Sequence, residues 1–112
     1  MDAIMIYVTT PSHDEAVRIG SALVEGHLAG SVNIFDGARS IYRWEGMVHD
    51  AGEAILIVKS VADRLPAITA RVKQLHSYEI PCIVAVPIIG GNEEYLAWLH
   101  DAVGRGQHAP KG

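Results

Sequence analysis

The stretch Glu53-Ala54-Ile55-Leu56-Ile57-Val58-Lys59 decides the fold class of this chain. Its centre is an unbroken apolar run rich in β-branched residues, which predicts a strand. Successive side chains of a strand point to opposite faces, so a run that is apolar at both parities predicts a strand with both faces covered. The runs Ile4–Thr9 and Ile83–Val86 have the same property. A sheet built from these strands therefore needs cover on both of its faces.

A helix is predicted on the N-terminal side of this central strand. Ser12 and Glu15 have the form of a capping box, in which Ser12 accepts from first-turn N–H groups and Glu15 reaches back. Gly26 or Gly30 is expected to end the helix. Apolar residues recur between these limits at helical spacing: Ala16, Ile19, Leu23 and Val24.

Two further helices are predicted on the C-terminal side. Asp63 is expected to cap the first, with Pro66 in its first turn, where a missing N–H does no harm. Asn92 is expected to cap the second. Their core stripes are Leu65, Ile68, Val72 and Leu75, and then Leu96, Leu99 and Val103. From Gly104 onward the periodicity stops, so residues 105–112 are predicted to be a frayed tail after a single domain of residues 1–104.

The remaining segments complete a recognisable order. They are a strand over Ser31–Phe35, a bend at Asp36-Gly37, extended chain over Ser40–Trp44, a hairpin turn at Glu45-Gly46, the segment Met47–Ser60 with the strongest strand at Glu53–Lys59, a loop over His76–Pro81 and a strand over Cys82–Ile88. The resulting order β-α-β-β-α-β-α matches the split βαβ pattern of a ferredoxin-like fold. The sequence thus predicts an α/β (α+β) domain with a long β-hairpin and an extra C-terminal helix.

One face of such a sheet lacks cover from its own chain. Two helices cover one face of a four-stranded sheet, and the strands are apolar on both faces. The uncovered patch would measure several hundred Å² by rough count, which is large for a monomer. Either the third helix or a partner must cover it. One short helix is too small to cover a whole sheet, so self-association is predicted.

Composition excludes several classes of protein. The chain has 9 basic against 13 acidic residues and no Lys/Arg block, so nucleic acid is not expected as a partner. No apolar segment approaches the length of a membrane span, and no basic signal region begins the chain, so the expected location is the cytoplasm. A single cysteine, Cys82, fits a reducing compartment. Gly-rich phosphate loops and the GxSxG, HExxH and CxxC motifs are absent, so an enzyme is not predicted.

Three blocks of sequence resemble the CutA-type divalent-cation tolerance family. Val32-Asn33-Ile34 with Ser40–Gly46 (SIYRWEG) is similar to the family's long hairpin, His76–Ile88 to its second block, and Gly91–Leu99 to its third. The blocks follow in the family's order and span roughly residues 4 to 100. The resemblance implies a ferredoxin-like homotrimer. It also implies a function in the response to divalent metal ions such as copper, with low-affinity binding and no obligatory cofactor.

The chain departs from the family pattern at three positions. Ser31 stands where the family usually has a cysteine, Ser77 where it has proline, and Cys82 where it has glutamate. A metal role of the family's cysteine or glutamate therefore does not carry over to this chain.

The resemblance implies that four residues approach a cleft between subunits, and they are our candidates for ligand binding: Lys59, His76, Tyr78 and Glu79. Among them, His76 and Glu79 offer an imidazole and a carboxylate, which suit Cu²⁺ or Zn²⁺ when a third ligand such as Cys82 joins. The alternative interpretation is structural. In it His76 caps the second helix, Glu79 pairs with Lys59 or Arg43, and Cys82 is a small buried hydrophobe.

Tyr42 and Trp44 are candidates for a subunit interface. They stand two apart and share one face of their strand. Large aromatics on a protruding hairpin are enriched in interfaces, and a stacking platform for a small ligand is the alternative. Three functions stay open: a divalent-cation tolerance protein, a trimeric regulatory module binding a small anionic metabolite between subunits, and a docking trimer without a ligand.

Overall fold

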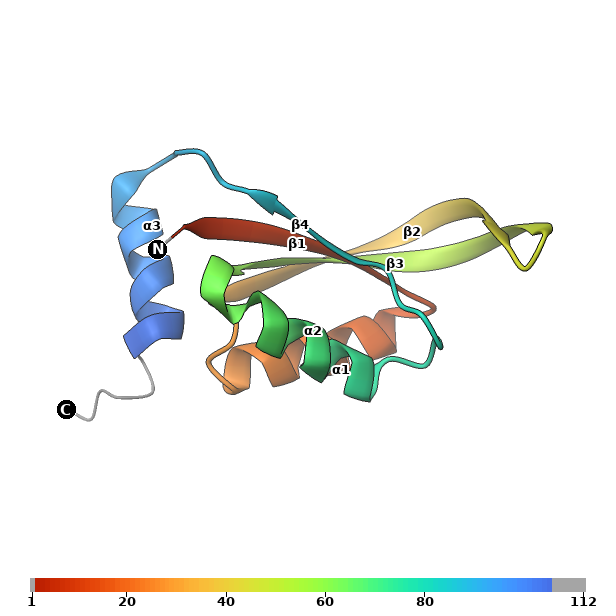
Figure 1. The fold of residues 1–112 in the computed structure, drawn as a ribbon, viewed down its shortest axis with the longest axis horizontal. Coiled ribbons are helices and arrows are strands. Elements are labelled where there is room, and N and C mark those ends of the chain that lie inside the picture. The colour runs from red at the N-terminus through yellow and green to blue at the C-terminus, as the bar shows by residue number, and fades with distance from the viewer. Residues whose placement is uncertain (1, 106–112) are drawn as a thin grey trace.

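A computed structural model describes residues 2–105 and has the predicted order of elements (Figure 1). The elements are β1 (Ala3–Thr10), α1 (His13–Glu25), β2 (Ser31–Trp44), β3 (Met47–Val61), α2 (Leu65–Leu75), β4 (Ile83–Pro87) and α3 (Glu93–His100). A 3-10 turn, Ala62–Arg64, precedes α2, and a π-helical turn, Asp101–Arg105, follows α3. Most of the predicted tail lies outside the described residues, and Arg105 belongs to the π turn rather than to a frayed end.

The four strands form one antiparallel sheet in the order β2-β3-β1-β4. Helices α1 and α2 lie side by side on one face of it (Figure 1). This is the ferredoxin-like arrangement, and the predicted fold class is confirmed.

The core lies between that sheet face and the two helices. Even-numbered residues of β1 and β3 point to the helices, and the apolar ones among them that are fully buried are Ile6, Val8, Leu56 and Val58. They pack against the predicted helix stripes at Ile19, Leu23, Ile68 and Val72. Leu65 and Leu75 pack at the margin of this core and are only partly buried.

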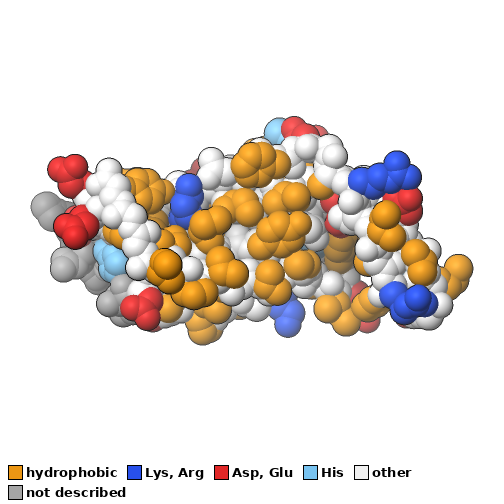
Figure 2. Space-filling view, turned by 90° about the horizontal axis from the view of Figure 1, so that it is seen from above, with side chains coloured by type: hydrophobic (Ala, Val, Ile, Leu, Met, Phe, Trp, Pro, Cys, Tyr) orange, Lys and Arg blue, Asp and Glu red, His pale blue; other side chains and the backbone are white. Residues whose placement is uncertain are grey.

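The other face of the sheet is open and apolar (Figure 2). Odd-numbered residues of β1 and β3 point to it, together with their cross-strand neighbours. Four large side chains on this face are exposed: Tyr7 (39%), Phe35 (58%), Val84 (55%) and Val86 (54%). Helix α3 packs at one end of the sheet and does not lie over this face (Figure 1). We refer to this surface below as the open face.

The β2–β3 hairpin extends beyond the rest of the sheet. The two extended segments predicted for β2 are one strand, with a bulge between Phe35 and Ala38. The pairing of β3 with β1 ends at Ala54. Between that point and the hairpin turn, β2 and β3 pair only with each other, and residues 38–53 form a protruding arm (Figure 1). The predicted turn is confirmed, since Glu45 and Gly46 have φ values of 52° and 80°.

The predicted helix caps are confirmed at two helices and wrong at the third. Ser12 accepts from the backbone N–H of Glu15 at 3.2 Å, and Asn92 accepts from that of Glu94 at 3.0 Å. Asp63 does not cap α2, because it lies inside the 3-10 turn. The N–H of Ala62 donates to the Asp2 carbonyl at 2.7 Å. This tertiary hydrogen bond begins the 3-10 turn at Ala62, one residue before the predicted cap at Asp63.

Candidate functional site

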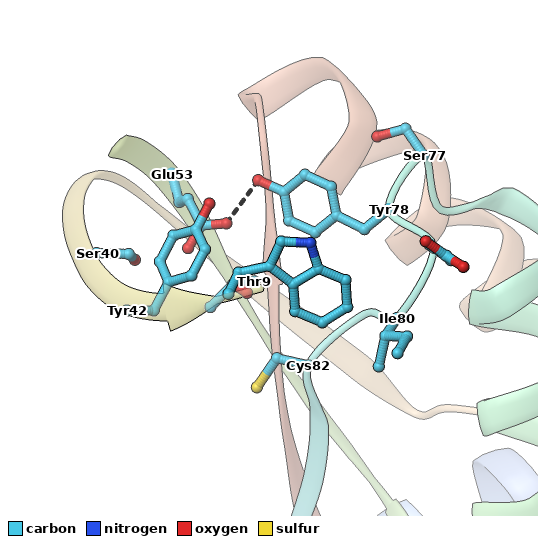
Figure 3. Close-up of a pocket in the computed structure, with 10 residues that line it drawn as sticks. Thr9, Ser40, Tyr42, Glu53, Ser77, Tyr78, Ile80 and Cys82 are labelled. Atoms are coloured by element: carbon cyan, nitrogen blue, oxygen red, sulfur yellow. Dashed lines mark hydrogen bonds between the residues drawn. The ribbon is translucent and has the colours of Figure 1, made fainter. Parts of the chain in front are cut away.

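A cavity of about 560 Å³ lies where the hairpin arm leaves the sheet (Figure 3). The arm forms one wall and the loop between α2 and β4 forms the other. Thr9 and Glu53, which point to the open face, lie between them. The complete lining is Thr9, Ser40, Tyr42, Trp44, Glu53, Ser77, Tyr78, Glu79, Ile80 and Cys82. We call this the arm pocket.

Strand geometry brings the arm's aromatic side chains to the pocket. Ser40, Tyr42 and Trp44 alternate along β2 and therefore share one face. Tyr42 is opposite His49 on β3, and their rings stack with centroids 5.3 Å apart. The predicted common face of Tyr42 and Trp44 is confirmed. It faces a loop of the same chain, which the sequence pattern did not indicate.

His76 holds that loop against the sheet. It is the C-cap residue of α2, and its side chain is fully buried. A carbonyl can only accept, so Nε2 donates to the carbonyl oxygen of Thr9 at 2.7 Å, while Nδ1 accepts from the Tyr78 N–H at 3.0 Å. Both ring nitrogens are thus engaged. The structural interpretation of His76 as a helix cap is confirmed.

Glu15 holds the same loop from the side of helix α1. Its carboxylate accepts from the Ser77 N–H at 3.0 Å and the Ser77 hydroxyl at 3.1 Å. The carboxylate therefore does not reach back to close the predicted capping box. Its Oε2 lies 3.4 Å from Nδ1 of His76, but that nitrogen already accepts from Tyr78, so we assign no ion pair there.

Tyr78 joins the loop to the sheet through Glu53. Its hydroxyl donates to Glu53 Oε2 at 2.7 Å, the bond drawn in Figure 3. Burial raises the pKa of Tyr78, and the hydrogen bond to Glu53 raises it further. The phenol therefore keeps its proton and remains a donor. Sequence reasoning missed Glu53; a charged residue beginning an apolar strand at the open-face parity is the signal that could have found it.

Cys82 is exposed, and the interpretation of it as a small buried hydrophobe is wrong. It precedes β4, which begins at Ile83, and lines the arm pocket. Partial desolvation beside the pocket wall and, after it, the charge of Glu53 raise the pKa of the thiol. The thiolate, which is the form that binds metals, is therefore scarce at neutral pH.

The predicted cleft residues are only partly brought together. Tyr78 and Glu79 line the arm pocket, and His76 lies behind its wall. Lys59 is six residues from Glu53 along β3, about 20 Å away at 3.4 Å per residue. Its Nζ lies 5.8 Å from the centroid of the Tyr95 ring. A place for Lys59 in a cleft between subunits stays a prediction. The proposed pairing of Glu79 with Lys59 or Arg43 does not occur between residues 2 and 105.

A Tyr78→Phe variant is expected to lose about 1–2 kcal/mol of free energy of unfolding, because Glu53 loses a charge-assisted hydrogen bond. Urea unfolding at fixed protein concentration measures this loss. Tyr42→Phe is the matched control, since its hydroxyl makes no hydrogen bond within residues 2–105. Equal stability of the two variants would show that the Tyr78–Glu53 bond contributes nothing.

The arrangement of arm, loop and sheet defines a class of protein. It is a ferredoxin-like α+β domain with a protruding hairpin, an open apolar sheet face and an acidic, aromatic pocket between arm and loop. The family model of the CutA1 divalent ion tolerance protein matches residues 4–102. The chain belongs to this family.

Relatives agree with this membership in sequence and in structure. The divalent-cation tolerance protein CutA of Thermus thermophilus is 47% identical over 100 residues, covering 89% of this chain and 97% of that protein. The solved Thermus structure superposes with a TM-score of 0.89 at 46% identity, covering 91% of this chain and 99% of that one. CutA1 of Oryza sativa superposes with a TM-score of 0.90 at 38% identity, covering 94% and 96%.

The relatives differ in the cellular location that their names give. The solved structure from Archaeoglobus fulgidus is described as a periplasmic divalent cation tolerance protein. It superposes with a TM-score of 0.87 at 42% identity, and the match covers 90% of this chain and 98% of the Archaeoglobus chain. The chain spans 56% of a chloroplastic relative from Oryza sativa, which is 40% identical over 89% of this chain. No helix within the described residues is long and apolar enough to cross a membrane.

Proposed function

We propose that this protein acts in divalent-cation tolerance by binding ions such as Cu²⁺ at low affinity, as a cytoplasmic homotrimer without catalytic activity. The observation that carries the metal-binding part is the arm pocket, whose lining includes the carboxylates of Glu53 and Glu79 and the thiol of Cys82. Residues 2–105 contain no group of three or more His, Cys, Asp or Glu side chains placed to hold one ion. Donor groups that line a pocket without three of them converging on one ion favour weak binding.

Glu79 is the better placed of the two predicted metal ligands. It is exposed, lines the pocket and makes no ion pair within the described part of the chain. His76 as a ligand stays a prediction, and it requires the ring to exchange one of its two hydrogen bonds for the metal. The elevated pKa of Cys82 makes the thiol a weak contributor at neutral pH.

Calorimetry with Cu²⁺ at pH 7 is expected to give modest binding by the parent and about tenfold weaker binding by Glu79→Gln. Below about pH 6 binding should weaken further, because imidazole and carboxylate must be unprotonated to bind a metal. Glu94→Gln is the matched control, an exposed carboxylate on α3 outside the pocket. Unchanged binding by Glu79→Gln would move the site elsewhere, and an inert parent would remove metal binding from the proposal. Unchanged binding by His76→Ala would remove His76 alone.

The open face and the hairpin arm support the proposal of a homotrimer. Four large apolar side chains on that face are 39–58% exposed in the single chain: Tyr7, Phe35, Val84 and Val86. The sheet also has two free edges, β2 and β4, whose unpaired backbone groups a neighbouring copy can satisfy. Identical contacts repeated head to tail around an axis close a ring and leave no open edge. Tyr42 and Trp44, 41% and 38% exposed, are our candidates for this contact.

The alternative of a small anionic metabolite finds no support in the arm pocket. Its lining contains two carboxylates and no Lys or Arg side chain. An anion placed there would meet like charge.

A further inference from the structure

The arm pocket of a single chain combines aromatic walls with negative charge that no ion pair within residues 2–105 neutralises. Three aromatic side chains line it from two segments distant in sequence: Tyr42 and Trp44 on the arm, and Tyr78 on the loop. Figure 3 shows Tyr42 and Tyr78 on opposite sides, with Glu53 between them. The faces of aromatic rings are electron-rich and attract cations within about 6 Å.

Glu53 supplies the charge at the base of this pocket. The residue is 8% exposed, so its carboxylate is largely removed from water. Within residues 2–105 no Lys, Arg or His nitrogen lies within 4.0 Å of it, and its hydrogen-bond partner is the neutral hydroxyl of Tyr78. A buried carboxylate without a counter-charge is costly, and a bound cation would remove that cost. The exposed carboxylate of Glu79 adds a second negative charge to the lining.

We propose that the arm pocket binds a small organic cation, an ammonium group carrying apolar substituents. The carboxylate of Glu53 would neutralise the charge, and the rings of Tyr42, Trp44 and Tyr78 would contact the substituents. A volume of about 560 Å³ falls in the range of sites for small molecules. The raised pKa values of Tyr78 and Cys82, both caused in part by Glu53, agree with a negative potential there.

An organic cation uses parts of the lining that the other ligand classes do not. A divalent metal ion would bind the carboxylates and leave the aromatic walls unused. A neutral apolar ligand would leave the charge of Glu53 uncompensated. This proposal goes beyond divalent-ion binding, because it depends on the rings, which metal binding does not use.

Calorimetry with choline and with 3,3-dimethyl-1-butanol tests the proposal on the full chain. The two molecules match in shape and differ in charge. We expect the parent to bind choline at least tenfold more tightly than the neutral alcohol. Equal affinity would reduce the pocket to an apolar cavity, and failure to bind choline, or tighter binding of acetate, would overturn the proposal.

Two variants separate the charge from the rings. Glu53→Gln keeps an acceptor for Tyr78 but removes the charge, and Trp44→Leu removes a ring. Each is expected to weaken choline binding about tenfold, while the Glu94→Gln control binds like the parent. Light scattering and thermal melting establish that each variant keeps the parent's mass and fold. If Trp44→Leu does not keep the parent's mass, Tyr42→Leu is used as the ring variant in the same choline titration. Parental affinity in both the charge and the ring variants would contradict the proposal.

The ring variant distinguishes this proposal from the metal-binding function, because Glu53 belongs to both. Trp44→Leu should bind Cu²⁺ as the parent does, since an indole ring offers no metal ligand. If Trp44→Leu loses choline binding and retains Cu²⁺ binding, the organic cation and the metal ion are bound by different side chains of the pocket. A parent that binds choline but not Cu²⁺ would overturn the metal proposal and leave this one standing.

Discussion

A Val86→Asp variant is expected to dissociate the proposed homotrimer into single chains. Val86 lies on β4 opposite Met5, so its side chain is on the open face, where it is 54% exposed in one chain. A carboxylate at an exposed position costs the isolated chain little. Buried against a neighbouring subunit, the same carboxylate lacks a partner and costs several kcal/mol per copy. Three copies of that cost exceed what a moderate interface supplies.

Light scattering on Val86→Asp at micromolar concentration measures this effect. Val17→Asp is the control for introducing the same charge, since Val17 lies on α1 and is 40% exposed, away from the sheet. Val86→Thr is the control for the strand, because threonine keeps the β-branch and adds no charge. Both controls should retain the parent's mass. Val86→Asp with the parent's mass would show that this part of the open face is not a subunit contact.

A His76→Ala variant is expected to lose about 3 kcal/mol or more of free energy of unfolding. Removal of the ring leaves the Thr9 carbonyl and the Tyr78 N–H without their partners, and each buried orphan costs about 1–3 kcal/mol. It also leaves a cavity at a fully buried position and removes the ring contact with Tyr78, whose centroid is 4.8 Å away. The loop should therefore detach from the sheet before the core unfolds.

Urea unfolding at fixed protein concentration measures the loss in His76→Ala. His13→Ala is the control, because His13 makes an exposed 2.8 Å contact with Asp36 that is worth under about 1 kcal/mol. A cost below about 1 kcal/mol for His76→Ala would contradict the role assigned to the ring.

The parts of the fold that depend on local pattern could be predicted from the sequence. Strand and helix order, the caps at Ser12 and Asn92, the turn at Glu45-Gly46 and the open face all follow from periodicity and short-range chemistry. The cap at Asp63 could not be predicted, because a backbone bond from Ala62 to distant Asp2 determines where the turn begins.

The site was predictable only in part, because its defining contacts join distant segments. Thr9 and His76 are 67 residues apart, Glu15 and Ser77 are 62 apart, and Glu53 and Tyr78 are 25 apart. A single sequence carries no signal for such pairings. The motif residues were therefore found, but the partners that fix their roles were not.

Light scattering on the parent protein at low micromolar concentration tests the central claim most directly. The exposed apolar face and the free sheet edges predict association, and the family resemblance implies three chains of 12.1 kDa, about 36 kDa in total. A particle of 12.1 kDa would mean that the open face stays uncovered in solution, and it would contradict the homotrimer.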